Sequence, residues 1–188
     1  DSGIVTAVIV TPGNVDDSQM LQPLVAAHTE KTGAKPAAVV ADSKYLSGDN
    51  VVHLQRAEIT DFIAAPTPKG HKQGRFSASD FTVEYDAAEQ PVRALCPNGA
   101  LSEKPRWKRQ TRSWVFFFTP GQCEGCPLRD RCTEQRRGRQ LSLSVHHQRL
   151  RGVRERQQTE AFTAAQVARL GIERKFARQS KQGGRRLP

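Results

Sequence analysis

Apolar and polar residues form alternating blocks at the start of the chain, and these blocks predict an α/β fold. Residues 4–11 (IVTAVIVT) are β-branched and almost continuously apolar, which is typical of a strand covered on both faces. A helix is expected from Asp16 or Asp17, either of which can cap it, to about Thr32, with Gly33 as its end. Strand 37–42, a short helix over 48–57 and strand 61–65 are expected next. This strand–helix–strand–helix–strand order predicts a sheet with right-handed crossovers.

The pattern changes after Pro66. Residues 67–153 are polar, basic and turn-rich, and they contain all four cysteines and both tryptophans. We interpret them as an inserted subdomain. A long helix is expected over about 154–180, with core candidates Phe162, Val167, Leu170 and Phe176. The expected organisation is a core made by residues 1–66 and 154–182, interrupted by the insert and followed by a tail over 183–188.

Charge favours a polyanionic partner. The 188 residues include 29 Lys and Arg against 19 Asp and Glu, a formal net charge of +10. Such a surplus favours nucleic acid, although a solubilising surface would give the same count. The longest wholly apolar stretches, Pro and Gly not counted, are the five residues 37–41 and the five residues 114–118, far short of the roughly 20 that span a bilayer. We therefore expect DNA, and no membrane, as the partner.

Two distant carboxylates predict metal-dependent chemistry. Asp42 ends the apolar run Ala37–Ala41, so a buried strand delivers an acid to its carboxyl end. Glu173 follows Arg169 by four residues, which places both on one face of the late helix. A strand-end Asp and a helix-borne Glu offer the hard oxygen ligands that a two-metal phosphoryl-transfer site needs.

The four cysteines have the spacing of metal ligands. Cys123 and Cys126 form a C-x2-C pair, Cys132 follows closely, and Cys96 precedes a Pro-Asn-Gly turn. Together they predict a structural Zn²⁺ site that holds the polar insert together. Reduced, unligated cysteines, an iron–sulfur cluster and a disulfide are the alternatives. No secretory signal pattern stands in the printed sequence, which favours a reducing compartment over disulfides.

Basic and aromatic residues suggest further nucleic-acid contacts. The arginine-rich runs 136–139 and 149–154 are interpreted as phosphate contacts, with a solvated face as the alternative. Trp107 and Trp114 could stack on unpaired bases, but packing around the cysteines is preferred.

Other polar residues are expected to be structural or solvated. Asp16 and Asp17 are interpreted as helix caps rather than catalytic acids. Asp61, Asp80 and Asp86 are expected on the surface, and the pair His146–His147 is expected to be exposed or to face phosphate.

Several segments resemble bacterial insertion-sequence transposases of the DDE type. They are residues 1–7 (DSGIVTA), 11–18 (TPGNVDDS), 39–45 (VVADSKY), 96–99 (CPNG), 123–129 (CEGCPLR) and the helix with Arg169 and Glu173. The branch that they resemble has a cysteine-bearing insert before the last catalytic acid. The similarity runs nearly end to end, and the order of the matches makes it specific.

The resemblance implies a ribonuclease H-like fold in which two Asp and one Glu hold two divalent ions, usually Mg²⁺. Water or a DNA 3′-hydroxyl then attacks a phosphodiester. By position, Asp42 matches the second acid and Glu173 the third. Arg169 matches an arginine that contacts DNA phosphate or orients the acid. The expected DNA-binding residues are Arg169, Lys44, Arg174, Lys181, Arg149 and Arg151.

The chain departs from that family pattern at several points. Gln166 stands where related helices carry Tyr, and Ser180 stands where they carry Lys, with Lys181 one place later. The first acid lies upstream of the Asp1–Ser2–Gly3 turn in relatives. The chain is therefore expected to be a C-terminal fragment that lacks two strands and is inactive alone.

The resemblance also sets the expected cellular context. Complete relatives are expected to act as homo-oligomers on transposon ends and target DNA, in the bacterial cytoplasm with the nucleoid. The alternative hypothesis is a non-catalytic, zinc-stabilised DNA-binding module.

Overall fold

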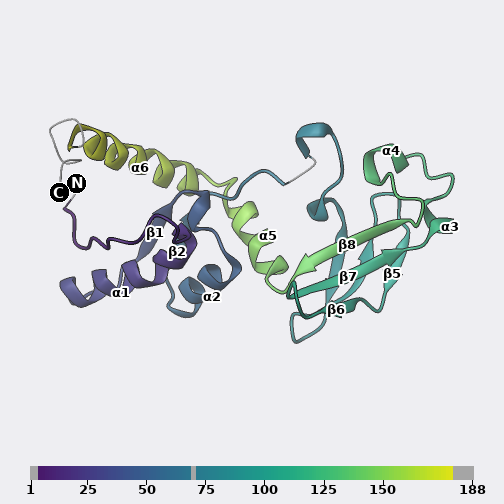
Figure 1. Cartoon of the computed structure of the whole chain (residues 1–188), viewed down its shortest axis with the longest axis horizontal. Coiled ribbons are helices and arrows are strands. Elements are labelled where there is room, and N and C mark those ends of the chain that lie inside the picture. The colour runs from purple at the N-terminus through teal and green to yellow at the C-terminus, as the bar shows by residue number, and fades with distance from the viewer. Residues whose placement is uncertain (1–3, 69–70, 180–188) are drawn as a thin grey trace. The chain divides into compact units, whose positions relative to one another are not determined.

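A computed structural model describes residues 4–68 and 71–179, and the side chains of all of these except Lys72 and 175–179. It is a mixed α/β structure that divides into two compact units (Figure 1). Unit 1 consists of residues 1–65 and 152–188, and unit 2 consists of residues 66–151. Among the described helices, none is both long and apolar enough to cross a membrane.

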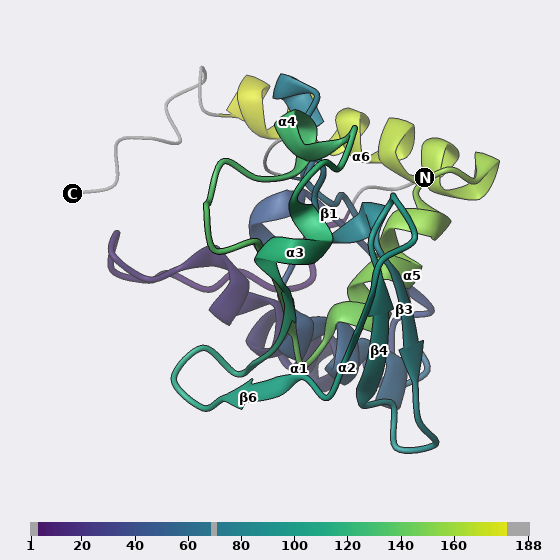
Figure 2. The ribbon, with the colours of Figure 1, turned by 90° about the vertical axis from the view of Figure 1, so that its right-hand side faces the viewer.

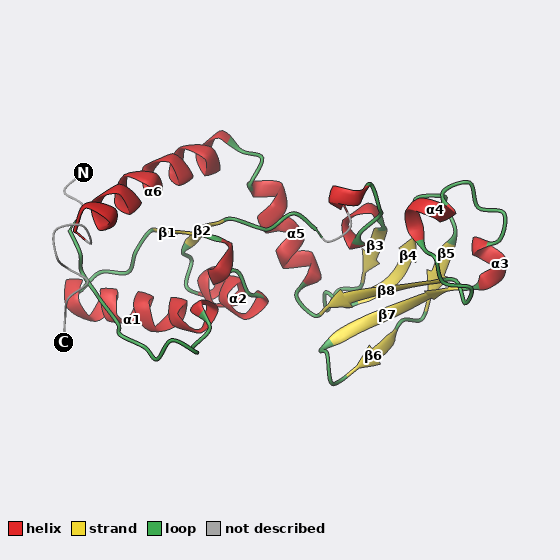
Figure 3. Cartoon of the chain, turned by 45° about the horizontal axis from the view of Figure 1, so that its top comes forward, coloured by secondary structure: helices red, strands yellow, loops and turns green. Residues whose placement is uncertain are grey.

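Unit 1 is built around two short parallel strands with helices beside them (Figure 3). Its elements are η1 (Asp17–Met20), α1 (Leu21–Thr32), β1 (Ala38–Ala41), η2 (Ser43–Tyr45), α2 (Gly48–Arg56), β2 (Thr60–Ile63) and α6 (Glu160–Gln179). Asp16 caps η1 by accepting a hydrogen bond from the Ser18 N–H, and Gly33 ends α1 in the left-handed region, as the sequence predicts. The core consists of Leu21, Leu54, Ile59 and Ile63.

The strand predicted over residues 4–11 is wrong. Residues 4–10 carry no strand, and in the described chain β1 pairs only with β2. Ile4 is 74% exposed and Val10 is 92% exposed. A β-branched run becomes a strand only where a neighbouring strand satisfies its backbone groups, and this segment has none beside it. Its side-chain hydrogen bond is instead from Thr6 to the α1 residue His28, 2.8 Å between Oγ1 and Nδ1.

The late helix is interrupted, which the sequence reading missed. Helix α5 (His147–Arg156) ends before α6 begins at Glu160. Thr159 explains the new start, because its Oγ1 accepts a hydrogen bond from the Phe162 N–H at 3.2 Å. Phe162 is buried as expected and packs edge-on against Phe62, with ring centroids 6.2 Å apart.

The other core candidates of this helix differ from the expectation. Val167 and Leu170 are exposed, because α6 covers a sheet of only two strands. The side chain of Phe176 lies outside the described residues.

Asp61 is buried rather than on the surface. It lies opposite Val39 in the parallel ladder, and its side chain is only 4% exposed. Arg156 donates a hydrogen bond from Nη2 to Asp61 Oδ2 at 2.7 Å. The prediction of a solvated Asp61 was wrong because an arginine distant in sequence compensates the burial of the charge.

Unit 2 contains two antiparallel sheets of three strands. The first consists of β3 (Thr82–Tyr85), β4 (Pro91–Leu95) and β5 (Leu101–Glu103), and the second of β6 (Arg106–Lys108), β7 (Ser113–Phe118) and β8 (Arg139–Ser144). The short helices are η3 (His71–Gln73), η4 (Ala78–Asp80), α3 (Pro120–Cys123) and α4 (Arg129–Cys132). One core joins the sheets, made by Phe81, Val83, Ala94, Phe116, Phe118, Leu141 and Leu143.

One side chain of unit 2, that of His147, contradicts the sequence reading. His147 is buried, and its Nδ1 lies 2.7 Å from the Tyr85 hydroxyl, so it faces neither solvent nor phosphate. Asp80 is exposed, as expected, and it also belongs to the capping box of η4, where it bonds Ser77 and His71. Asp86 is exposed in a turn, as expected.

Candidate active site and metal-binding residues

Asp42 is held at the carboxyl end of β1. The strand ends at Ala41, and Asp42 caps η2 by accepting a hydrogen bond from the Lys44 N–H to Oδ1 at 2.8 Å. In the described chain Oδ2 has no hydrogen bond. Ligands of α/β sheets bind outside the carboxyl ends of the strands, which is the position of this carboxylate.

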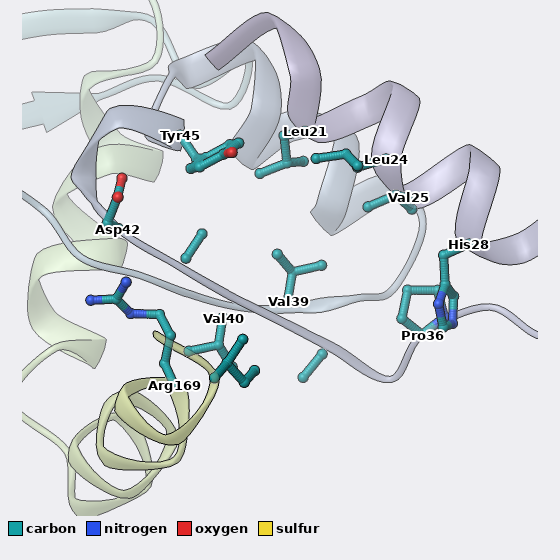
Figure 4. Close-up of a pocket in the computed structure, with 13 residues that line it drawn as sticks. Leu21, Leu24, Val25, His28, Pro36, Val39, Val40, Asp42, Tyr45 and Arg169 are labelled. Atoms are coloured by element: carbon teal, nitrogen blue, oxygen red, sulfur yellow. The ribbon is translucent and has the colours of Figure 1, made fainter. Parts of the chain in front are cut away.

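Asp42 borders a pocket of about 490 Å³ in unit 1 (Figure 4). Its walls are mostly apolar and come from α1, β1 and α6: Leu21, Leu24, Val25, His28, Pro36, Ala38, Val39, Val40, Ala41, Tyr45 and Ile172. Arg169 is the other charged lining residue, and Figure 4 shows it reaching from α6 toward the end of β1. The pocket therefore brings Asp42 and Arg169 together from positions 127 residues apart.

Gln166 attaches α6 to this edge of the sheet. Its Nε2 donates to the main-chain oxygens of Ala41 at 3.2 Å and Phe62 at 2.6 Å, at the ends of β1 and β2. Its Oε1 accepts a hydrogen bond from Arg169 Nε at 3.0 Å. Sequence reading noted Gln166 only as a departure from related helices. The position of these two main-chain carbonyls leaves no mark in the sequence.

Glu173 joins the site through Arg169. Arg169 Nη1 donates to Glu173 Oε1 at 2.5 Å, and the Glu173 side chain is 54% exposed. Glu173 lies seven residues beyond Gln166, or about 10 Å further along the helix axis. Of these two residues, Gln166 is the one that bonds the main chain at the strand ends. Sharing of one metal ion by the carboxylates of Asp42 and Glu173 stays a prediction.

The carboxylate oxygens of Asp42 and Glu173 are of the type that Mg²⁺ prefers, but they are not gathered around one point. Asp42 offers a carboxylate oxygen at the pocket, whereas an arginine engages that of Glu173. In the part of the chain that the structure describes, no three His, Cys, Asp or Glu side chains form a ready metal site.

The residues expected to bind DNA are spread over both units. In unit 1, Lys44 pairs with Asp17 at 3.7 Å, and Arg174 is exposed near the end of α6. In unit 2, Arg149 donates to Glu89 at 2.7 Å, and Arg151 is exposed. Lys181 lies outside the described residues.

All four cysteines line one small cavity of unit 2, of about 20 Å³. Cys96 comes from the turn after β4, and Cys123, Cys126 and Cys132 come from α3, α4 and the turn between them. Burial raises the pKa of the Cys132 thiol, the Arg139 charge opposes this, and the three other cysteines add to the rise. Folding therefore gathers the thiols that the sequence separates.

Comparison with known families gives a match. The family described as "Transposase DDE domain" matches residues 95–188, half of the chain, which include Glu173 and the four cysteines. The chain belongs to this transposase family. Comparison with curated proteins and with solved structures found no match.

Membership of the DDE transposase family identifies the type of chemistry. Transposases act on DNA, and DDE transposases generally use a divalent metal ion such as Mg²⁺. Arg169 and Glu173 lie inside the matched segment, while Asp42 lies outside it.

This transposase chain carries a basic hairpin that the sequence reading missed. Between Glu103 and Glu124 there is no acidic residue, and strands β6 and β7 with their turn carry Arg106, Lys108, Arg109 and Arg112. We name residues 104–114, which include β6, the turn and the start of β7, the basic hairpin.

The two tryptophans belong to this hairpin and not to the cysteine cavity, contrary to the preferred reading. Trp107 and Trp114 lie opposite each other on β6 and β7, with ring centroids 5.0 Å apart. Trp107 is 44% exposed. In Figures 2 and 3, α3 and α4 lie at the end of unit 2 away from β6. The hairpin therefore presents positive charge and an aromatic ring together.

Proposed function

We propose that the chain supplies Asp42 and Glu173 to the active site of a DDE transposase that cuts and joins insertion-sequence DNA. The observation that carries this proposal is the pocket at the carboxyl end of β1. There Asp42 lies with Arg169, and Arg169 holds Glu173. The strand–helix order of unit 1 supports a ribonuclease H-like core, which is part of the proposal.

Each side chain has a role in this account. Mg²⁺, when bound, activates the attacking oxygen and stabilises the leaving oxygen of the phosphodiester. The carboxylates of Asp42 and Glu173 would hold it. Gln166 fixes α6 against the strand ends, so that Arg169 stays beside the pocket. The Arg169 guanidinium can exchange its bond with Glu173 for a bidentate bond to a DNA phosphate.

Double-stranded DNA is the proposed partner, bound through its phosphates. The basic hairpin offers several cations in a stretch of sequence that contains no Asp or Glu, and Trp107 offers a stacking surface. Lys108→Gln and Arg109→Gln should each lower DNA affinity and reduce the slope of log K against log salt by about 0.9. Lys31→Gln on α1 is the control. An unchanged slope in both hairpin variants would exclude the hairpin as the DNA contact.

Cleavage of a duplex carrying an insertion-sequence end tests the catalytic claim. Because the resemblance places the first acid upstream of Asp1, the assay uses a form of the protein extended by that upstream segment. It is incubated with labelled DNA and Mg²⁺, beside Asp42→Asn, Glu173→Gln and the control Glu160→Gln. Glu160 is exposed in the first turn of the same helix. Cleavage should require Mg²⁺ and be lost in the first two variants only. Cleavage that survives either substitution would refute the assignment.

A non-catalytic DNA-binding module is the second candidate function. The engagement of Glu173 by Arg169 and the lack of a ready three-ligand site in the described chain favour it. DNA binding that is insensitive to Mg²⁺, without cleavage and unchanged by Asp42→Asn, would select this module over the transposase active site.

A further inference from the structure

We propose that the four cysteines of unit 2 bind one Zn²⁺ ion in a structural tetrathiolate site. Cys96 is separated from Cys123 by 26 residues, yet all four side chains line the same cavity. Its volume of about 20 Å³ accommodates one water-sized occupant, since a water needs about 10–15 Å³. Thiolates are the ligands that structural Zn²⁺ prefers, in tetrahedral sets of four.

The turn after β4 prepares Cys96 to act as a ligand. Its carbonyl accepts a hydrogen bond from the Gly99 N–H at 2.8 Å, which closes the Pro-Asn-Gly turn. The Ala100 N–H then donates to Cys96 Sγ at 3.3 Å. A main-chain N–H that points at sulfur is the kind of outer hydrogen bond that orients a metal-ligating side chain.

The second half of the site is one compact segment. The Cys126 N–H donates to the Cys123 carbonyl at 3.4 Å, and Gly125 adopts a positive φ of 69° within this turn. The Arg129 N–H donates to the Cys126 carbonyl at 3.1 Å, which begins the helix that ends at Cys132. The C-x2-C pair and the third cysteine are therefore fixed by the backbone on one side of the cavity.

The charge around the cavity complements a metal tetrathiolate. Zn²⁺ with four thiolates carries a net charge of −2, and two arginines, Arg129 and Arg139, line the same cavity. In the described chain the buried Nε of Arg139 has no hydrogen-bond partner. A thiolate could accept this bond. Arg139 also lies over the Phe81 ring, 5.9 Å from its centroid, and Arg129 Nη1 donates to the Cys123 carbonyl at 3.5 Å, so both guanidinium groups are held at the cavity wall.

The alternatives fit less well. All four cysteines are free thiols, so no disulfide occupies the site. An iron–sulfur cluster contains several atoms and exceeds a cavity of this size. In the described structure the four thiols are not close enough together to form a finished metal site. Zinc binding would therefore draw the sulfur atoms toward the centre of the cavity. The ion would then link the β4–β5 turn to the α3–α4 segment and stabilise unit 2, whatever the DNA chemistry of unit 1.

Metal analysis of matched variants tests this site. Cys126 is chosen because it does not belong to the packed core, unlike the other three cysteines. The variants are Cys126→Ser, which removes a ligand, Cys126→His, which restores one, and the exposed neighbour Glu124→Ser as the control. The full chain and Glu124→Ser should contain about one zinc per molecule, and Cys126→His should retain it. Cys126→Ser should lose most of it.

Cobalt substitution keeps the test decisive if Cys126→Ser fails to fold. The chelator-treated full chain should take up one Co²⁺ with the ligand-field bands of a tetrahedral tetrathiolate, and Zn²⁺ should displace it. A folded chain that takes up neither ion, and whose four thiols react freely with a thiol reagent in the presence of Zn²⁺, would overturn the proposal. Iron with inorganic sulfide, or equal zinc in Cys126→Ser and the full chain, would also overturn it.

Discussion

Arg169 and Glu173 form an ion pair on α6, with 2.5 Å between Nη1 and Oε1. The pair is partly exposed, so its direct contribution to stability is at most about 1 kcal/mol. The pair matters because it holds Glu173 to Arg169, which also lines the pocket that contains Asp42. The pair connects the two acids that the transposase assignment needs.

The attachment of α6 to the sheet depends on Gln166. In Gln166→Ala, the Phe62 carbonyl loses its 2.6 Å donor, whereas the Ala41 carbonyl keeps the Ala64 N–H. We expect the free energy of unfolding to fall by about 1–2 kcal/mol, measured by chemical denaturation. Gln158→Ala, at an exposed position outside the helices, is the control. Equal stability of the two variants would show that Gln166 does not hold α6.

The ion pair between Asp61 and Arg156 predicts that mutations at these two positions have non-additive effects on stability. Arg156→Ala leaves the Asp61 carboxylate buried without its cation, at a cost of about 3 kcal/mol. Adding Asp61→Asn should recover part of this loss. Arg93→Ala, which breaks an exposed pair with Glu103, should cost less than about 1 kcal/mol. Additive effects at positions 61 and 156 would contradict the coupling.

Gly138 allows a close approach between β8 and the end of β7. It has a φ of 86°, and an added Cβ would lie 2.1 Å from the Phe118 carbonyl oxygen. Gly138→Ala should therefore destabilise unit 2 by more than about 2 kcal/mol. The control Gly74→Ala has a similar φ of 69° but open space, so only the backbone strain of about 1 kcal/mol applies. The thermal unfolding midpoints of the two variants should differ clearly, and equal midpoints would contradict the clash.

Asp80 should make the free energy of unfolding of unit 2 depend on pH in the acid range. Burial raises the pKa of Asp80, but hydrogen bonds from His71 and Ser77 outweigh it, and the net pKa is lowered. A carboxylate with a depressed pKa stabilises the fold above its unfolded pKa of about 3.9. That stability is lost as pH falls through the lower folded value.

Comparison of two variants across the acid range checks this sign. Asp80→Asn should flatten the dependence of the unfolding midpoint on pH below about 4, whereas the exposed control Asp130→Asn should not. A slope that is unchanged in Asp80→Asn would show that another group causes the acid sensitivity.

Local sequence patterns predicted three elements of unit 1 correctly. Strands 37–42 and 61–65 and the helix over 48–57 correspond to β1, β2 and α2, because β-branched runs and caps act over a few residues. The run 4–11 is richer in β-branched residues than either strand and yet forms no strand, because pairing depends on a neighbour that composition does not encode.

The sequence predicted which types of residue form the candidate sites, but not which residues contact one another there. Asp42 follows its strand as expected, but the interaction of Gln166 with two main-chain carbonyls depends on how α6 crosses the sheet. Likewise, the C-x2-C spacing identified Cys123 and Cys126, while only the folded β4–β5 turn brings Cys96 to them.

Divalent metal binding at Asp42 and Glu173 tests the central claim most directly. Mn²⁺, a paramagnetic substitute for Mg²⁺, is titrated into the full chain and followed by electron paramagnetic resonance. Asp42→Asn and Glu173→Gln should each weaken binding by more than about tenfold, or ~1.4 kcal/mol, while Glu160→Gln leaves it unchanged. Equal Mn²⁺ affinity in all four proteins would show that these two carboxylates do not share a metal ion.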